Sequence, residues 1–311
     1  MQALAVVLEK PGELALRALE MVPMGDADLL VEIAFSGIST GTERLLWSGA
    51  MPAFPGLGYP LVPGYESVGR VIDAGPKAQG LLGRQVFVPG AACWREARGL
   101  FGGTARRLVV PAGRVVPLPE EVGEEGVIFA LAATALHALE LGGGPLPDII
   151  VGHGALGRLL ARLAVVRGGS PRVWEVNPAR RGGAQGYVVT TPDADDGPPA
   201  ARVIDASGAP GIVDALVARL QRGGELVLAG FYDRVDFAFP PAFMKEVAIR
   251  IAAEFAPADL AAVVALAADG RLALDGLVTH RADPTAAANA YEAAFTDPDC
   301  IKMILDWREV A

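Results

Sequence analysis

The chain has 311 residues, of which 52% are hydrophobic and 20% charged, a composition typical of a folded globular protein. Its 27 basic and 36 acidic residues give a net charge of -9, and no Lys/Arg-rich run stands out. The composition therefore excludes a disordered chain and argues against a nucleic-acid partner.

Short strands fill the first third of the chain. Apolar or alternating runs cover residues 3–9, 28–39, 66–75, 83–90 and 106–119, and Gly or Pro lies in the gaps between them. Short strands at regular spacing with such turns predict a compact β-barrel or sandwich-like domain.

Helices and strands alternate after residue 120. The apolar pattern predicts a buried helix, then strands that end in glycine turns and are separated by amphipathic helices: helices at 120–141, 156–169 and 211–224, and strands at 148–151, 172–176, 201–208 and 224–230. This alternation indicates a parallel, doubly wound sheet. The stretch 182–200 is too short and too rich in Gly and Pro for a full crossover helix, and 245–255 is predicted to be the other edge strand.

The segment "IIVGHGALGRLL" carries a GxGxxG motif between an apolar strand and an amphipathic helix. In that context Gly152 permits a tight turn, Gly154 lets the backbone approach a pyrophosphate, and Gly157 allows helix and strand to pack closely. Glu175, at the end of the next strand, is expected to bind the adenosine ribose hydroxyls, which favours NAD. NADP stays open, because two arginines follow that could bind a phosphate: Arg180 and Arg181.

Other coenzyme contacts are expected at the carboxyl edge of the sheet, where ligands of doubly wound folds bind. The residues predicted to supply these contacts are His153, Ala155, Leu156, Asn177, Arg180, Ser207, Gly208 and Gly230. The alternative is a glycine turn that merely connects two elements, with Glu175 at a solvated strand end.

Together these pieces resemble the medium-chain dehydrogenase/reductase superfamily over nearly the full chain. The segments that carry the resemblance are "SGISTGTERLLWSG", "PLVPGYESVGRV", "FGGTARRLVVPAGRVVPLP" and "FALAATALHAL". The resemblance implies an α/β fold with a GroES-like β-barrel catalytic domain over 1–125 and 256–311, and a Rossmann doubly wound parallel sheet over 126–255. It also implies that Thr134 contacts the nicotinamide and that the Rossmann edge strand forms a homodimer.

The catalytic zinc ligands of that superfamily are missing. Their positions fall on residues without a soft donor, namely Ser39 or Thr40, Tyr65 and Ala130. Only Glu66 remains, and zinc needs three or four N, S or O donors. Cys93 and Cys300 are the only cysteines, so the four-cysteine structural lobe is missing too. We therefore predict a protein without metal.

Among metal-free members, "SGISTGTE", "VPGYESVGRV" and "WEVNPARR" are most similar to the bacteriochlorophyllide dehydrogenases of bacteriochlorophyll biosynthesis. This resemblance implies oxidation of the 3-(1-hydroxyethyl) group of a bacteriochlorophyllide, or of a chlorin precursor, to 3-acetyl with NAD. A large, flat, apolar macrocycle requires a wide pocket with aromatic contacts. The candidates for that pocket, each of which could instead pack in the core, are Trp47, Phe54, Tyr59, Trp94, Phe101, Phe231 and Tyr232.

Oxidation of an alcohol without a metal requires another group to take the hydroxyl proton. Tyr65 is predicted to be the proton acceptor or an alkoxide-stabilising donor. Thr42 and Ser39 are predicted to form its relay, and Glu66 to orient it. Tyr65 could instead fill the volume left by histidine and metal, and Glu66 could be structural, since a buried carboxylate must be paired.

Two other functions stay open. A zinc-free quinone or enoyl reductase would reduce an activated double bond with NADPH, and a non-catalytic protein on this scaffold would sense NAD(H). The N-terminus lacks the segments of a signal peptide, and no uninterrupted apolar window reaches about 18 residues. We therefore expect a cytoplasmic protein without a membrane span.

Overall fold

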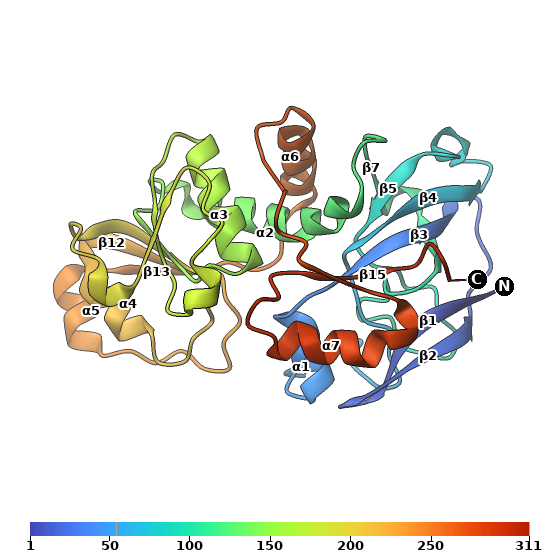
Figure 1. Ribbon diagram of the computed structural model, residues 1–311, viewed down its shortest axis with the longest axis horizontal. Coiled ribbons are helices and arrows are strands. Elements are labelled where there is room, and N and C mark those ends of the chain that lie inside the picture. The colour runs from blue at the N-terminus through green and yellow to red at the C-terminus, as the bar shows by residue number, and fades with distance from the viewer. Residues whose placement is uncertain (54, 311) are drawn as a thin grey trace. The chain divides into compact units, whose positions relative to one another are not determined.

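The computed structural model describes residues 1–53 and 55–310. The chain divides into two compact units, one of Met1–Ala130 with Leu274–Ala311 and one of Leu131–Ala273. The contacts therefore assign residues 256–273 to the second unit, whereas the sequence analysis assigned them to the first. Both termini belong to the first unit (Figure 1).

The strands are β1 (Gln2–Lys10), β2 (Glu13–Glu20), β3 (Asp28–Ile38), β4 (Ser67–Ala74), β5 (Gln85–Val88), β6 (Arg107–Pro111), β7 (Val116–Pro117), β8 (Ile149–Val151), β9 (Arg172–Trp174), β10 (Val188–Thr190), β11 (Ala200–Asp205), β12 (Leu220–Leu228), β13 (Ala248–Ile251), β14 (His280–Ala282) and β15 (Met303–Asp306). The α-helices are α1 (Thr42–Ser48), α2 (Phe129–Glu140), α3 (Ala155–Val166), α4 (Val213–Arg219), α5 (Phe239–Lys245), α6 (Pro257–Ala268) and α7 (Ala287–Thr296). Short 3-10 turns connect them, of which η3 (Glu124–Ile128), η4 (Leu141–Gly143), η5 (Pro178–Arg180) and η6 (Pro192–Ala194) are used below.

The first unit is built around β3. This strand pairs with β4, β6 and β15, and the resulting seven-stranded sheet runs β14-β15-β3-β4-β5-β7, with β6 attached to β3. The antiparallel pair β1–β2 is a separate two-stranded sheet. Because β15 comes from the end of the chain, it brings the C-terminal residues beside Ile38, where β3 ends. The expected GroES-like barrel is therefore completed by the C-terminal tail.

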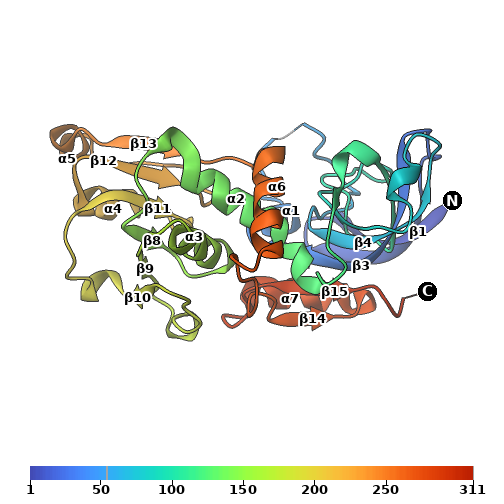
Figure 2. The same ribbon diagram turned by 90° about the horizontal axis from the view of Figure 1, so that it is seen from above.

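The second unit is a six-stranded sheet in the order β10-β9-β8-β11-β12-β13, and all its neighbouring strands are parallel. The strand order reverses between β8 and β11, so the residues that follow these two strands lie at the switch point where doubly wound folds bind ligands. Figure 2 shows α3 beside the strands of this sheet. The predicted α/β fold, a GroES-like unit with a Rossmann sheet, is confirmed.

The crossovers differ along the sheet. Helices α3, α4 and α5 connect β8 to β9, β11 to β12 and β12 to β13, whereas only η5 and η6 lie among the connections on either side of β10. The predicted loss of a crossover helix is therefore confirmed. Strand β13 is the edge strand expected at 245–255.

One helical run is both long and apolar. The run Glu124–Gly143, made of η3, α2 and η4, is long and apolar enough to cross a membrane by length and composition alone. Its longest apolar stretch, residues 127–136, ends at His137. Most of the run's apolar window is buried inside the fold, as in the core helix of a globular protein.

Candidate active site

Three hydroxyl groups meet where β3 ends and β4 begins. The antiparallel register pairs Ser36 with Ser67, so the residues after the first strand lie opposite those before the second. The Tyr65 hydroxyl consequently lies 2.7 Å from Ser39 Oγ and 3.4 Å from Thr42 Oγ1. The structure thus brings the three predicted hydroxyl residues together.

Tyr65 is half-buried, and its ring packs edge-to-face on Phe101 with 5.0 Å between ring centroids. Burial, with the charge of Glu66, raises the pKa of Tyr65 above its ordinary value, and the bond to Ser39 opposes this only in part. The side chain is therefore a neutral phenol at neutral pH. A neutral phenol can donate one hydrogen bond and accept another, which suits a relay better than a pre-ionised base.

Glu66 is fully buried, and its Oε2 lies 2.7 Å from the Nζ atom of Lys302, which is 1% exposed. Lys302 also donates to the carbonyl oxygen of Ile38 at 3.2 Å. Gly37 leaves space for the Glu66 carboxylate, because a Cβ atom at position 37 would lie only 2.3 Å from Glu66 Oε2. Burial raises the pKa of Glu66, whereas the charge of Lys302 lowers it, and the close contact supports an ion pair.

Glu43, on α1, joins the same loop to the C-terminal helix. Its Oε1 accepts a hydrogen bond from Ser39 N at 3.0 Å, and its Oε2 accepts one from the Tyr291 hydroxyl at 2.5 Å. Figure 1 shows α7, which carries Tyr291, beside α1. Glu43 is fully buried, and this burial raises its pKa to about 7, while the two hydrogen bonds oppose the shift.

We predict that Glu43 makes the protein less stable as the pH rises. Between the pKa of about 4.5 expected in the unfolded chain and about 7 in the folded one, the folded state binds more protons than the unfolded state. The free energy of unfolding should therefore fall across this window, by roughly 3 kcal/mol from this group. Urea denaturation at pH 5, 6, 7 and 8 should show that Glu43→Gln flattens this dependence. Parallel curves for the two proteins would contradict the prediction.

The sequence analysis assigned no role to three of these residues: Glu43, Tyr291 and Lys302. For Lys302 a signal was present, because a single cation in the otherwise apolar "IKMIL" requires an anionic partner if it is buried. Nothing local pointed to Tyr291 as the partner of Glu43.

The donor atoms at the superfamily's metal positions do not fit zinc. Ser39 and Tyr65 offer hydroxyls that bond to each other, Ala130 offers no side-chain donor, and Glu66 is bonded to Lys302. In the part of the chain that the structure describes, no group of three or more His, Cys, Asp and Glu side chains could hold a metal. We therefore propose no metal-dependent step for this site.

The glycine turn after β8 has the geometry of a phosphate cradle. Gly152 has φ +92°, which favours glycine, and a Cβ atom on Gly157 would lie 1.8 Å from the carbonyl oxygen of Gly152. A Cβ atom on Gly154 would meet nothing within 4 Å, so the backbone there is open to a ligand. Helix α3 begins at Ala155, and no side chain caps its N-terminus. The first backbone N–H groups of the helix, which include those of Ala155 and Leu156, are therefore available to an anion.

The other predicted coenzyme residues lie on the same unit. Gly152 lies against Ser207, and Gly208 lies against Gly230, because Cβ atoms on Gly152 and Gly230 would fall 3.2 and 2.5 Å from those neighbours. Asp205 holds the Ser207 turn, since its Oδ1 accepts from Ser207 N at 2.9 Å and from its Oγ at 2.6 Å. The remaining ones are Glu175, Asn177 and Arg180, described below, and Thr134, which is half-buried on α2.

The candidate pocket aromatics separate into three groups. Trp47, Tyr59 and Phe101 pack around one small cluster of buried leucines, and the Tyr59 hydroxyl donates to Leu46 O. Trp94 belongs to the main core of the first unit, where its Nε1 donates to Gly102 O, so it is not free to line a pocket.

On the second unit, Phe231 is 49% exposed, whereas the Tyr232 hydroxyl is bonded to Asp205 Oδ2 at 2.5 Å. Tyr232 therefore supports the strand end rather than offering its hydroxyl to a ligand. Phe54 lies outside the described residues.

Comparisons with known proteins agree with this architecture. The family model of the alcohol dehydrogenase GroES-like domain matches residues 25–120. A short chain alcohol dehydrogenase from Escherichia coli CFT073, solved with NADH, superimposes with a TM-score of 0.84 at 20% identity, covering 98% of this chain and 99% of that one. This structural likeness shows the fold, and the domain match together with the two relatives described next places the chain in the medium-chain dehydrogenase/reductase superfamily.

Two full-length relatives narrow this class. The 2-desacetyl-2-hydroxyethyl bacteriochlorophyllide A dehydrogenase of Rhodobacter capsulatus is 56% identical and covers 99% of both chains. The protein of the same name from Cereibacter sphaeroides is 51% identical and covers 100% of both. The chain belongs to the bacteriochlorophyllide dehydrogenase family.

Proposed function

We propose that this protein is a cytoplasmic, zinc-independent enzyme that uses NAD to oxidise the 3-(1-hydroxyethyl) group of a bacteriochlorophyllide, or of a chlorin precursor, to 3-acetyl. The observation that carries the proposal is the cluster of Ser39, Thr42 and Tyr65 hydroxyls, because the superfamily resemblance assigns zinc-ligand positions to Ser39 and Tyr65. The relatives at 56% and 51% identity, which are named for this substrate class, support it.

The chain's own residues handle the proton. Oxidation of a secondary alcohol removes a proton from oxygen and a hydride from carbon. We propose that the Tyr65 hydroxyl accepts the substrate proton as it passes its own proton to Ser39 or Thr42, whose hydroxyl in turn releases its proton to solvent water. No phenolate then has to form in advance. Glu43 holds the Ser39 backbone, and the Glu66–Lys302 pair fixes the strand ends beside it.

The coenzyme-binding residues proposed for the second unit fit a dinucleotide. The open backbone at Gly154 and the uncapped start of α3 suit a pyrophosphate, and Glu175 suits a ribose with free hydroxyls. NAD, when bound, supplies the hydride acceptor. The bound NADH of the structural neighbour is consistent with this assignment.

We propose that Trp47, Tyr59 and Phe101 contact the macrocycle, because they form one apolar group next to Tyr65. Flat aromatic and leucine side chains suit a flat apolar ring.

The test is turnover. Purified protein, treated with a chelator, is incubated with 3-hydroxyethyl bacteriochlorophyllide and either NAD or NADP, and reduced nicotinamide is followed by absorbance. We expect turnover with NAD, at least tenfold more efficient than with NADP, and formation of the 3-acetyl product. Loss of activity on chelation that added zinc restores would contradict the zinc-independent chemistry, and coenzyme binding without turnover would contradict an enzymatic role.

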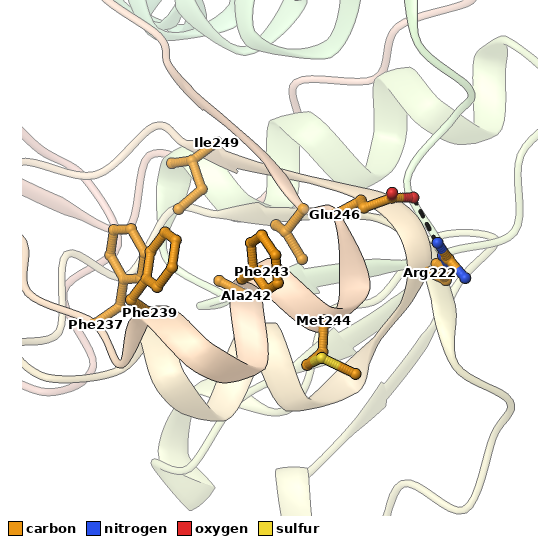
Figure 3. A pocket seen from close by; sticks show the side chains of 9 residues that line it. Arg222, Phe237, Phe239, Ala242, Phe243, Met244, Glu246 and Ile249 are labelled. Atoms are coloured by element: carbon orange, nitrogen blue, oxygen red, sulfur yellow. Dashed lines mark hydrogen bonds and ion pairs between the residues drawn. The ribbon is translucent and has the colours of Figure 1, made fainter.

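We further propose a homodimer formed through β13. Five large apolar side chains on or beside α5 and β13 are exposed, each by at least 41%: Phe237, Phe239, Phe243, Met244 and Ile251. The first four line a surface hollow of about 500 Å³ (Figure 3), in which Phe237 and Phe239 lie on one side and the Arg222–Glu246 ion pair lies on the other.

An edge strand presents unpaired N–H and C=O groups, and an apolar patch beside it is a mark of protein association. A second copy of the chain fits both features, because two β13 strands can pair across a two-fold axis and cover both patches.

Phe243→Glu is expected to convert the dimer to a monomer, because it places a charge in the centre of the apolar patch. Light scattering after size-exclusion chromatography should show twice the chain mass for the wild type and one chain mass for the variant. Val188→Glu is the matched control, since Val188 is 63% exposed on β10, the opposite edge of the sheet, and should leave the dimer intact. A monomeric wild type would contradict the proposal.

A further inference from the structure

His153 lies between the first two glycines of the turn and is fully buried. Its Nδ1 lies 2.6 Å from the carbonyl oxygen of Arg180, and its Nε2 lies 2.8 Å from the Tyr187 hydroxyl. A carbonyl oxygen only accepts, so Nδ1 carries the proton and Nε2 accepts from the tyrosine. Burial lowers the pKa of His153 to about 4, so the ring stays neutral and keeps this pattern at neutral pH.

Arg158, on α3, also links the glycine turn to the segment around Arg180. Its side chain is buried, and it donates from Nε to the carbonyl oxygen of His153 at 3.0 Å and from Nη2 to that of Arg180 at 3.1 Å. The ring of His153 also meets the ring of Tyr187 edge-to-face. The loop 177–187 is therefore fastened to the glycine turn near both of its ends, at Arg180 and at Tyr187.

The fastened loop adjoins the groups expected to meet the adenosine ribose. The Glu175 carboxylate accepts hydrogen bonds from His153 N at 2.9 Å and from Asn177 N at 2.8 Å. The guanidinium of Arg181 binds two backbone carbonyl oxygens: Nε donates to Glu175 O at 3.0 Å, and Nη2 donates to Val176 O at 2.8 Å. This arrangement presents a carboxylate and commits the guanidinium of Arg181 to two carbonyl oxygens.

The two coenzymes differ at the group that would meet these residues. A ribose with free hydroxyls donates to a carboxylate, whereas a 2′-phosphate is repelled by it and is bound well by a guanidinium. If the loop loosens, Arg181 can leave its carbonyl partners and reach a phosphate.

We propose that His153 and Tyr187 form a clamp that sets coenzyme selectivity, by holding loop 177–187 where the site accepts an adenosine ribose with two free hydroxyls and rejects a 2′-phosphate. The inference rests on the proposed use of NAD. His153 and Tyr187 are positioning residues, because they act through Glu175 and Arg181.

The test uses Tyr187→Phe, which removes the clamp's hydroxyl and keeps its ring. Calorimetric titration gives the dissociation constants of NADH and NADPH for the intact protein and the variant. We expect the preference for NADH, expressed as the ratio of the two constants, to fall about fivefold to tenfold, the effect of one lost hydrogen bond. Adding Arg181→Ala to Tyr187→Phe should bring the ratio back towards the wild-type value.

Thr191→Val is the matched control, since it removes a hydroxyl that caps η6 just beyond the loop and should leave the ratio unchanged. An unchanged ratio in Tyr187→Phe overturns the clamp, and so does an equal weakening of both coenzymes, which is what a purely structural role produces. The wild type alone tests the underlying function: a wild type that prefers NADPH, or binds neither coenzyme, contradicts the proposed use of NAD.

Discussion

Tyr65→Phe is expected to lower kcat for alcohol oxidation at least about 10²-fold and to leave NADH binding unchanged. The variant keeps the ring that packs on Phe101 but loses the hydroxyl that contacts Ser39 and Thr42. General acid–base groups contribute roughly 10²–10⁴-fold to rates, so loss of the relay should appear in kcat rather than in coenzyme affinity. Steady-state kinetics with 3-hydroxyethyl bacteriochlorophyllide and calorimetric titration of NADH measure the two effects.

Ser67→Ala is the control for this prediction. It removes a buried hydroxyl two residues away, which donates to Gly103 O and lies outside the relay. Its kcat should stay within a few-fold of the wild type. If Tyr65→Phe kept a wild-type kcat, Tyr65 would only fill space and the proton would have to leave by another route.

Lys302→Met is expected to cause the largest loss of stability, about 3–5 kcal/mol in the free energy of unfolding. The substitution leaves the fully buried Glu66 without its cation, because the lysine Nζ is 2.7 Å from the carboxylate. Glu66 Oε1 already has no hydrogen-bond partner, so the charge cannot be balanced locally. Urea denaturation at pH 7 measures the difference from the wild type.

The double variant Glu66→Gln with Lys302→Met separates the charge from the packing. It removes the buried anion as well, so it should recover a large part of the lost stability although one more side chain has changed. The ion pair would be unimportant if Lys302→Met unfolded at the wild-type urea concentration. Equal stability of the single and double variants would show that lost packing, not uncompensated charge, is the cause.

Local patterns predicted the architecture well. The alternation of apolar strands and helices after residue 120 led to the parallel sheet, and Gly152, Gly154 and Gly157 marked the turn between β8 and α3. These features can be predicted because periodicity and glycine spacing reflect backbone geometry within a few residues. The contacts group residues 256–273, which include α6, with the second unit, whereas the sequence analysis placed them in the first.

The candidate site was predicted only in part. The hydroxyls of Ser39, Thr42 and Tyr65 were expected together, because the resemblance placed them in one loop region. The aromatic residues were less predictable, since Trp94 lies in a stretch bounded by Gly90 and Gly99, as a loop residue would, and yet is buried in the core. The identity of one aromatic residue does not tell which other side chains will pack over it in the folded chain.

The sequence by itself determined the fold class, the alternation of strands and helices after residue 120, and the lack of thiol and imidazole groups at the positions that the resemblance assigns to zinc ligands. Each of these depends on which residue types follow one another. Only the tertiary structure decided the partners of the buried charges. Lys302 and Glu66 are 236 residues apart, and Tyr291 and Glu43 are 248 apart. A buried charge must find a partner, but which one it finds depends on β15 and α7 folding back onto the first strands. That return is a property of the packed chain and not of any local pattern.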